Sequence, residues 1–445
     1  MQPSHQAYGG PAQTFLQQQA LIQALLASAK QTHPSQSSAY TQPSFFTSAS
    51  ANNANDPSPS TANGQHALRL KVRDYFQNLM TPQLREQLRG KEGGELYRDT
   101  IRQMGRDGWL AVGWPKEHGG QGYGPTEQFI FFEEANIAGA PLPFVTISTV
   151  GPALMAHGTE LQKARFLPGI AAGEIIFAIG YSEPDAGSDL AVLKTAARLE
   201  GDTFVVNGAK LWTSGAESAD YIWLAARTDP ERPRHKGVSI LILDTQAEGF
   251  SATVIPTTSN PTTATFYDNV RVPKDMLVGE LNGGWKLITA QLNHERLGLG
   301  AWSDKVVGLF GRVLAWARAA DENGVRATDK AWVRAGLAQC YARLEAMRLI
   351  NLRIAADLER ERMDVALAST TKVYGSESGI EILRTLSNIV GANGLVRSGS
   401  AASLLHGDLE YEVRASVTLT FGGGTNEIQR ELIAQFGLGM PRTQR

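Results

Sequence analysis

The sequence predicts an α+β protein in which two helix-rich segments flank a β-rich one. Apolar residues follow helical spacing over residues 66–173 and again from residue 282 to the end. Between them, residues 174–281 hold short apolar runs bounded by Gly, Pro, Asn and Asp, a pattern typical of strands and turns. No helical stretch separates these runs, so an antiparallel sheet or barrel is expected rather than a parallel sheet.

Residues 1–65 differ in composition from the rest of the chain. Their only formal charges are Lys30 and Asp56, and they are rich in Gln, Ser, Ala, Asn and Pro. Such a segment cannot bury enough apolar surface to fold, so a disordered low-complexity extension is expected. It is too polar for a signal-peptide core and contains no arginine, so neither a signal nor a transit peptide is predicted. We therefore expect a cytoplasmic protein.

The first helical segment, residues 66–173, includes "ALRLKVRDYFQNLM", "YRDTIRQMGRDGWLAVG" and "TEQFIFFEEANIAGA". Between the last two lies "WPKEHGGQGYGP", which contains Gly120, Gly122 and Gly124. No strand precedes these glycines and no βαβ unit surrounds them, which disfavours a dinucleotide-binding loop. We interpret the stretch as a glycine-rich loop that joins helices.

Two strand ends in the β-rich segment carry polar clusters. "GYSEPDAGSDLA" provides hydroxyl groups from Ser182 and Ser188, and Gly187 allows close approach of a ligand. "KLWTSGAESADY" provides Trp212, which could shield a planar ring, and Ser214 beside it. The alternative is that both are ordinary strand-end turns.

A glutamate interrupts an apolar stripe in the last helical segment. Within "GGWKLITAQLNHERLGLGAW", Glu295 shares one helical face with Trp285, Ile288, Leu292 and Leu299. A buried glutamate is costly unless it is paired or functional, and burial raises its pKa toward the range of a general base. The alternative is a salt bridge at the edge of the stripe, with Arg296 or another arginine.

A glycine triplet marks the C-terminal stretch "LTFGGGTNEIQRELIAQFG". Gly422, Gly423 and Gly424 precede an amphipathic run, Ile428 to Phe436. Glycines before a helix start let backbone N–H groups approach an anion or a polarised oxygen. Such a backbone pocket stabilises negative charge but cannot remove a proton, so a base must come from elsewhere.

Composition excludes several other classes of function. The 445 residues carry a net charge of −2, which argues against bulk binding of nucleic acid. The single cysteine, Cys340, rules out an internal disulfide, and the eight histidines show no metal-ligand spacing. No apolar run approaches the roughly 18 residues of a membrane span.

Five motifs together resemble the acyl-CoA dehydrogenase family, in the family's order, over residues 66–445: "WPKEHGGQGYG", "YSEPDAGSD", "NGAKLWTSGAESADY", "ATFYDNVRVPKDMLVG" and "FGGGTNEIQRELI". The resemblance implies an N-terminal helical domain (66–173), an antiparallel β-barrel domain (174–281) and a C-terminal helical bundle (282–445). It also implies bound FAD and α,β-dehydrogenation of an acyl-CoA thioester to the trans-2-enoyl-CoA. Electrons would pass to an electron-transfer flavoprotein or a similar acceptor.

The resemblance assigns roles to individual residues. Ser182 and Ser214 would contact the flavin ring, and Trp212 would pack against it. The other implied cofactor contacts are Gly187, Ser188, Thr425 and Glu427. Ser188 would also lie near the CoA chain, and the backbone N–H of Gly423 would bond the thioester carbonyl.

The resemblance also bears on the base. Many members place a catalytic glutamate immediately before the Gly-Thr pair, where this chain has Gly423. A minority carry it on an earlier helix in a Glu-Arg pair, which "NHERL" matches. Glu295 is therefore expected to be the base, and Arg296 to contact the substrate.

One departure bears on assembly. The family's Arg-x-x-Phe-Gly motif, which reaches the FAD of a neighbouring subunit, is missing from "AWARAADENGVRATD", and "NIVGANGLVR" replaces a Gly-Gly-x-Gly motif. This pattern resembles the actinobacterial dehydrogenases of steroid side-chain catabolism, whose unlike subunits form α2β2 assemblies. The leading hypothesis is thus a catalytic subunit acting on a bulky, steroid-type CoA ester.

Three alternatives remain. One is a homotetrameric dehydrogenase of short or branched acyl-CoA, and another is a non-catalytic structural subunit of the same fold, against which Glu295 argues. The third, a DNA-associated flavoprotein, is disfavoured by the charge balance and by the lack of a basic C-terminal extension.

Overall fold

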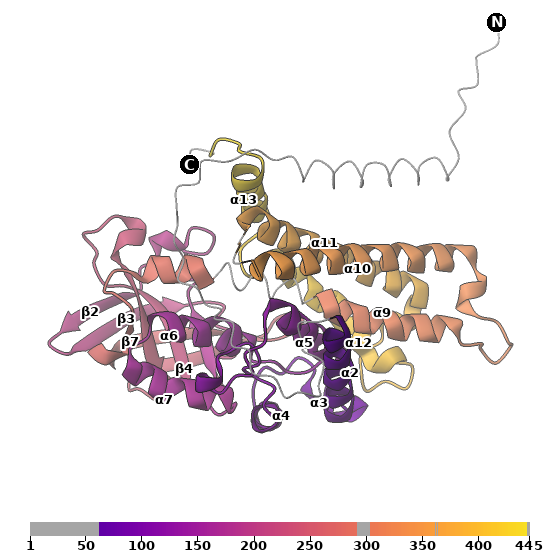
Figure 1. Ribbon diagram of the computed structural model, residues 1–445, viewed down its shortest axis with the longest axis horizontal. Helices are drawn as coiled ribbons and strands as arrows, with labels where there is room; N and C mark the ends of the chain where they lie inside the picture. The colour runs from indigo at the N-terminus through magenta and orange to yellow at the C-terminus, as the bar shows by residue number, and fades with distance from the viewer. Residues whose placement is uncertain (1–61, 292–302, 361, 363, 443–445) are drawn as a thin grey trace, which may run out of the picture. The chain divides into compact units, whose positions relative to one another are not determined.

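The computed structural model describes residues 62–291, 303–360, 362 and 364–442 (Figure 1). The first helical segment contains α2 (Ala62–Leu79), α3 (Pro82–Leu88), α4 (Glu95–Arg106), α5 (Pro125–Ala138), α6 (Gly151–His157) and α7 (Glu160–Ala171). Because α2 begins at Ala62, the last four residues of the predicted extension are helical, whereas residues 1–61 lie outside the described part. No helix among the described residues is both long and apolar enough to cross a bilayer.

Packing of α2 on α5 forms the core of this segment. Leu68, Val72 and Phe76 recur at every fourth residue of α2 and are buried. The ring of Phe76 lies 5.6 Å from that of Phe131 in α5, which stacks on Trp109 at 6.0 Å. The apolar residues that recur at helical spacing in the sequence of α2 are thus the residues that pack in the core.

The glycine-rich loop between α4 and α5 joins helices, as predicted, and no strand precedes it from residue 62 onward. Gly119 and Gly122 have φ values of 84° and 72°. A Cβ atom on Gly120 would lie 2.0 Å from the carbonyl oxygen of Trp114, so only glycine allows this close approach.

The middle segment is one sheet of eight strands, ordered β6-β7-β3-β2-β4-β5-β8 with β1 beside β4. The strands are β1 (Phe177–Gly180), β2 (Ala196–Glu200), β3 (Thr203–Lys210), β4 (Tyr221–Arg227), β5 (Val238–Asp244), β6 (Phe250–Ile255), β7 (Thr262–Pro273) and β8 (Leu277–Val278). Most pairs are antiparallel, as the sequence predicts. Within the described residues no pairing joins β6 to β8, so the predicted barrel is open between these two edges.

One pairing in this sheet differs from the expectation. β1 pairs with β4 in parallel, and β2 meets β4 in parallel at a single position. The chain between β1 and β4 contains the β2–β3 hairpin, which is long enough for the crossover that parallel strands require. Phe166 of α7 packs edge-on against Phe177 and Tyr221 and so covers the start of this pair.

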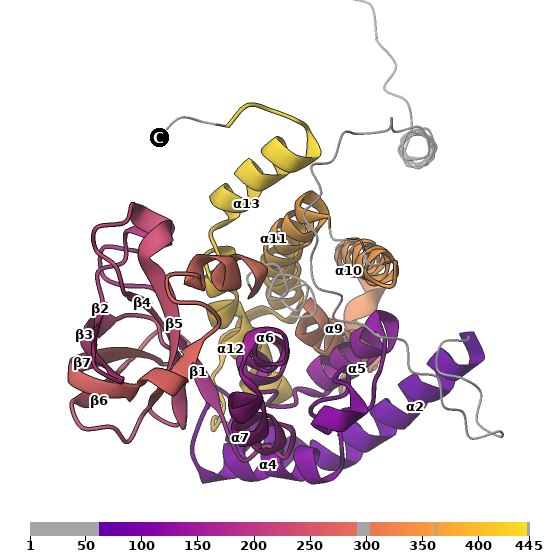
Figure 2. The ribbon, with the colours of Figure 1, turned by 60° about the vertical axis from the view of Figure 1, so that its left-hand side comes forward.

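The last segment is helical again. A helix covers residues 284–291 of the described chain. It is followed by α9 (Ser303–Arg318), α10 (Ala331–Leu358), α11 (Val365–Val390), α12 (Asp408–Ala415) and α13 (Asn426–Leu432). The long helices α10 and α11 lie side by side (Figures 1 and 2) and enclose a second core with α9.

Candidate active site

Two strand-end turns of the sheet are fastened to each other. The backbone N–H of Leu211 donates to the carbonyl of Ser182 at 2.9 Å. Lys210 is fully buried, and its Nζ donates to the carbonyl of Tyr181 at 3.0 Å and to Oε1 of Glu183 at 2.8 Å. The turn after β1 and the turn after β3 are therefore held at a fixed separation.

The pKa values of both partners of this buried ion pair, Lys210 and Glu183, are shifted. Glu183 also accepts from the backbone N–H groups of Lys194 and Thr195, at 2.7 and 2.8 Å. Although burial acts to raise it, the Lys210 charge and these donors hold the pKa of Glu183 below its ordinary value. Burial lowers the pKa of Lys210 to about 8, against the opposing effect of Glu183.

Trp212 follows this junction in a backbone conformation that is rare for a bulky residue. Its φ is 64° and its side chain is 60% exposed. The next two residues are fixed to β7: Thr213 N–H donates to the Thr263 carbonyl at 2.9 Å, and the Ser214 hydroxyl lies 2.9 Å from that of Thr262. A strained, exposed indole on a rigid support is typical of a ligand contact.

The predicted contacts Gly187 and Ser188 lie on the exposed loop that leaves the first turn. This loop closes on itself through a bridge between Glu183 and Ala186. No atom lies within 4 Å of a Cβ atom placed on Gly187, and Ser188 makes no hydrogen bond within the described residues. Both positions have room for a ligand.

The C-terminal glycine turn supports α13. Gly423 and Gly424 have φ values of 67° and 98°, and Thr425 caps the helix by accepting from the N–H of Ile428 at 3.3 Å. Glu427 is exposed in the first turn. No hydrogen bond or ion pair within the described residues joins this turn to the two strand-end turns.

Behind this turn lies a buried amide. Gln429 is fully buried, and neither its Nε2 nor its Oε1 has a hydrogen-bond partner among the described residues. A Cβ atom on Gly424 would lie 2.8 Å from this Nε2. The pattern of the sequence did not single out Gln429, because a glutamine in an amphipathic run is ordinarily solvated.

The helix that begins at residue 284 contains the first part of the apolar stripe predicted from the sequence, and this part packs in the core. Ile288 and Gln291 are buried, and Trp285 is half-buried. Oε1 of Gln291 accepts from Nε1 of Trp223 at 3.3 Å and from the hydroxyl of Tyr181. Gln291 thus ties this helix to the residue before Ser182, a role that the sequence reasoning missed. Glu295 and Arg296 lie outside the described residues.

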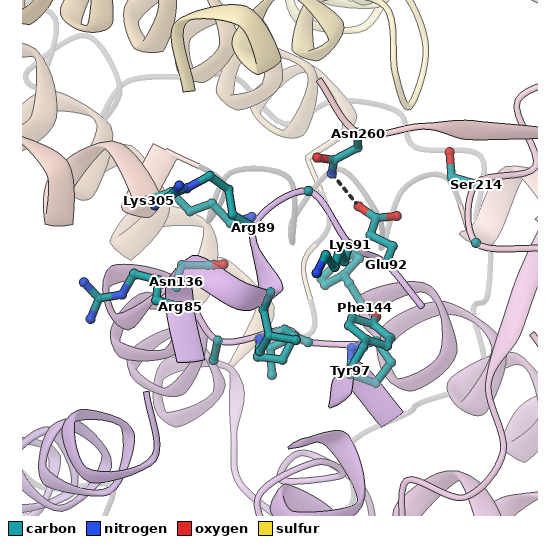
Figure 3. A pocket seen from close by; sticks show the side chains of 18 of the residues that line it. Arg85, Arg89, Lys91, Glu92, Tyr97, Asn136, Phe144, Ser214, Asn260 and Lys305 are labelled. Atoms are coloured by element: carbon teal, nitrogen blue, oxygen red, sulfur yellow. Dashed lines mark hydrogen bonds between the residues drawn. The ribbon is translucent and has the colours of Figure 1, made fainter. Parts of the chain in front are cut away.

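A cavity of about 310 Å³ lies beside the turn after β3 (Figure 3). Of the predicted site residues, Ser214 lines it. The other walls come from Arg85 and Leu88 in α3, residues 89–92 after it, residues 139–146 after α5, and the helices α9 and α12. A second cavity of about 170 Å³, lined by Phe129, Met155 and other mainly apolar residues, lies between α5 and α10.

Comparison with known proteins identifies the family. Models described as the N-terminal, middle and C-terminal domains of acyl-CoA dehydrogenase match residues 62–174, 178–270 and 282–438. Acyl-CoA dehydrogenase FadE26 of Mycobacterium tuberculosis is 49% identical over 393 residues, which cover 86% of this chain and 98% of that protein.

Solved structures agree with this match. One described as "Tcur3481-Tcur3483 steroid ACAD" is 50% identical, with a TM-score of 0.82 over 86% of this chain and 99% of its own. The ChsE4-ChsE5 complex from M. tuberculosis includes a chain that is 49% identical, with a TM-score of 0.80 over the same shares. The three domains, the order of their motifs and these similarities together show that the chain belongs to the acyl-CoA dehydrogenase family.

Proposed function

We propose that this acyl-CoA dehydrogenase is the catalytic subunit of an FAD-dependent enzyme that converts a bulky, steroid-type CoA ester to its trans-2-enoyl-CoA. The observation that carries the proposal is the strained, exposed Trp212 between Ser182 and Ser214. The similarity to a solved steroid ACAD over nearly the whole length of that chain supports the substrate class.

The residues present fit a flavin. A flat indole held outward beside two serine residues suits a planar ring with polar edges. Ser182, Trp212 and Ser214 would hold the ring, and the other contacts would come from Gly187, Ser188, Thr425 and Glu427. When bound, FAD accepts the hydride from the β carbon of the acyl group.

The chain's own residues would handle the proton and the developing charge. Glu295 would remove the α proton, and the N–H of Gly423 would stabilise the thioester oxygen as negative charge develops there. Gly423 has no side chain that could accept a proton, so the base must lie elsewhere. Ser188 and Arg296 would contact the CoA ester.

Other proteins complete the reaction. It needs an external electron acceptor, for which we propose an electron-transfer flavoprotein or a protein of similar chemistry. A homologous second subunit in an α2β2 assembly is proposed because two structures at about 50% identity are each described by a pair of names, Tcur3481-Tcur3483 and ChsE4-ChsE5.

The test of this function is Glu295→Gln, which keeps the size of the side chain but cannot accept a proton. We expect normal flavin content and a fall in turnover of about 10³-fold or more, measured with a steroid side-chain CoA ester and a dye acceptor. The control Glu322→Gln changes an exposed glutamate between α9 and α10 and should leave turnover within about twofold. Flavin reduction by Glu295→Gln at close to the unmodified rate would show that another group is the base.

A further inference from the structure

We propose that the cavity beside Ser214 binds the end of the acyl group remote from the thioester and selects acyl groups that carry a hydrogen-bond-accepting oxygen there. The inference rests on the proposed function, because Ser214 belongs to the turn that would contact the flavin ring. A thioester placed at this turn has the cavity directly beside it.

The cavity has an apolar part and a cationic part. Its apolar lining includes Phe132, Leu142, Phe144, Phe177 and Leu309. On the side away from Ser214, Figure 3 shows Arg85, Arg89 and Lys305 together. A ligand that fits both parts has a hydrocarbon body and a polar far end.

The arginine residues of the cationic part outnumber the carboxylates that bond to them within the described residues. Arg89 and Arg312 both bond to Asp408, one to each carboxylate oxygen, so two guanidinium groups share one negative charge. Asp408 and Arg89 are nearly buried, with 9% and 11% of their side chains exposed. Nε and Nη1 of Arg89 make no hydrogen bond within the described residues, so donors remain for a ligand.

Arg85 and Glu412 add to the excess of positive charge in this part of the cavity. Arg85 donates to the carbonyls of Ala138 and Met80, at 3.1 and 3.3 Å, and has no carboxylate partner among the described residues. Burial raises the pKa of the Glu412 carboxyl against the opposing charges of Lys305, Arg312 and Arg89, so its negative charge is less favoured than that of an exposed glutamate. An acceptor oxygen on the ligand would use the free donors, and a carboxylate would also offset the charge.

The test compares three CoA esters with the same carbon chain, ending in a methyl group, a ketone or a carboxylate. Binding is measured by calorimetry without an electron acceptor, on the flavin-loaded complex of the full-length chain with its homologous second subunit. We expect both oxygenated esters to bind about tenfold or more tightly than the plain ester, as hydrogen bonds from charged donors imply. Equal binding of the three esters would overturn the proposal.

Two variants should act in opposite directions. Arg89→Met leaves Asp408 and Arg312 as a neutral pair and should reduce the preference to less than about threefold. Asp408→Asn leaves both guanidinium groups without a carboxylate and should strengthen binding of the carboxylate ester relative to the ketone. If Asp408→Asn fails to fold, Arg89→Met still decides the matter.

The matched control is Arg98→Met. Arg98 is similarly buried and paired with Asp220, but it does not line the cavity. It should keep the preference of the unmodified protein, and a preference that survives in Arg89→Met would overturn the assignment. Tight binding of oxygenated esters without dehydrogenation would contradict the proposed function alone, whereas turnover without any preference would contradict the cavity assignment alone.

Discussion

Trp212 combines a strained backbone with an exposed side chain. A non-glycine residue in the left-handed region costs about 1–3 kcal/mol, and at Trp212 most of the side chain is not packed against the protein. The exposed indole therefore contributes little to folding. The proposed contact with the flavin would account for its conformation.

Trp212→Gly should change the stability of the protein and its affinity for flavin in opposite directions. Glycine adopts this φ without strain, so we expect the free energy of unfolding of the flavin-free protein to rise by about 1 kcal/mol in urea titrations. Flavin affinity should fall at least about tenfold, because one aromatic stacking contact is lost. The control Trp212→Phe keeps a ring and should keep most of the flavin. Unchanged flavin affinity in Trp212→Gly would mean that the cofactor does not stack on this residue.

At the residue scale, the resemblance to the family pointed to Trp212 and Ser214, because an aromatic and a hydroxyl residue at a strand end can also form an ordinary turn. It did not point to Lys210 or Gln291. Their importance comes from partners 27 and 110 residues away, Glu183 and Tyr181, which spacing along the chain cannot reveal.

At the scale of elements, the ion pair of Lys210 and Glu183 ties the end of β3 to the turn after β1. The pKa of Glu183 is held below its ordinary value of 4.5, so its contribution to stability is present above about pH 4.5 and is lost as the pH falls through the lower, folded-state pKa. Removing the carboxylate leaves Lys210 buried without its partner.

Glu183→Gln should therefore unfold more easily by about 3 kcal/mol at pH 7, as removal of one partner of a buried pair implies. We expect this difference to shrink as the pH falls below about 4.5, where the unmodified glutamate also becomes protonated. Denaturant titrations from pH 7 to pH 3 measure it. Glu200→Gln, which breaks an exposed pair with Arg198, serves as the control and should differ little at any pH. A difference that stays constant with pH would rule out this role of the pair.

Element prediction succeeded where the pattern was local. Amphipathic spacing located the helices, and the alternation of short apolar runs with turn residues located the strands. It did not show the parallel pairing of β1 with β4 or the opening between β6 and β8, because pairing partners depend on the whole sheet. Thr425 illustrates the limit at a site, because its hydroxyl caps α13, a structural role that the sequence reasoning did not assign to it.

At the scale of the whole molecule, the connection between α9 and α10 bears on assembly. Residues 319–330, where the family's Phe-Gly motif is missing, form turns and a short 3-10 helix (Ala327–Asp329). Arg326 and Asp329 are linked to each other through the backbone N–H of Arg326 at 2.9 Å. Residues 319–330 contain no aromatic residue that could contact the cofactor of a neighbouring subunit.

Co-expression with a homologous subunit should give an α2β2 assembly that contains about half the FAD of one site per chain, because each complete site would need both kinds of subunit. Native mass and flavin absorbance measure the two quantities. Expressed alone, the chain should be flavin-poor. A stable homotetramer with one FAD per chain and full activity would instead favour the short- or branched-chain alternative.

The parallel pairing of β1 with β4 also constrains the order in which the chain can fold. Phe177 aligns with Tyr221, so the first strand of the sheet has no partner in the sheet until more than forty further residues have been synthesised. The β2–β3 hairpin, by contrast, closes over a short turn and can form first. A nascent chain in which β1 has emerged before β4 therefore presents an unpaired apolar strand, and such strands are prone to aggregation.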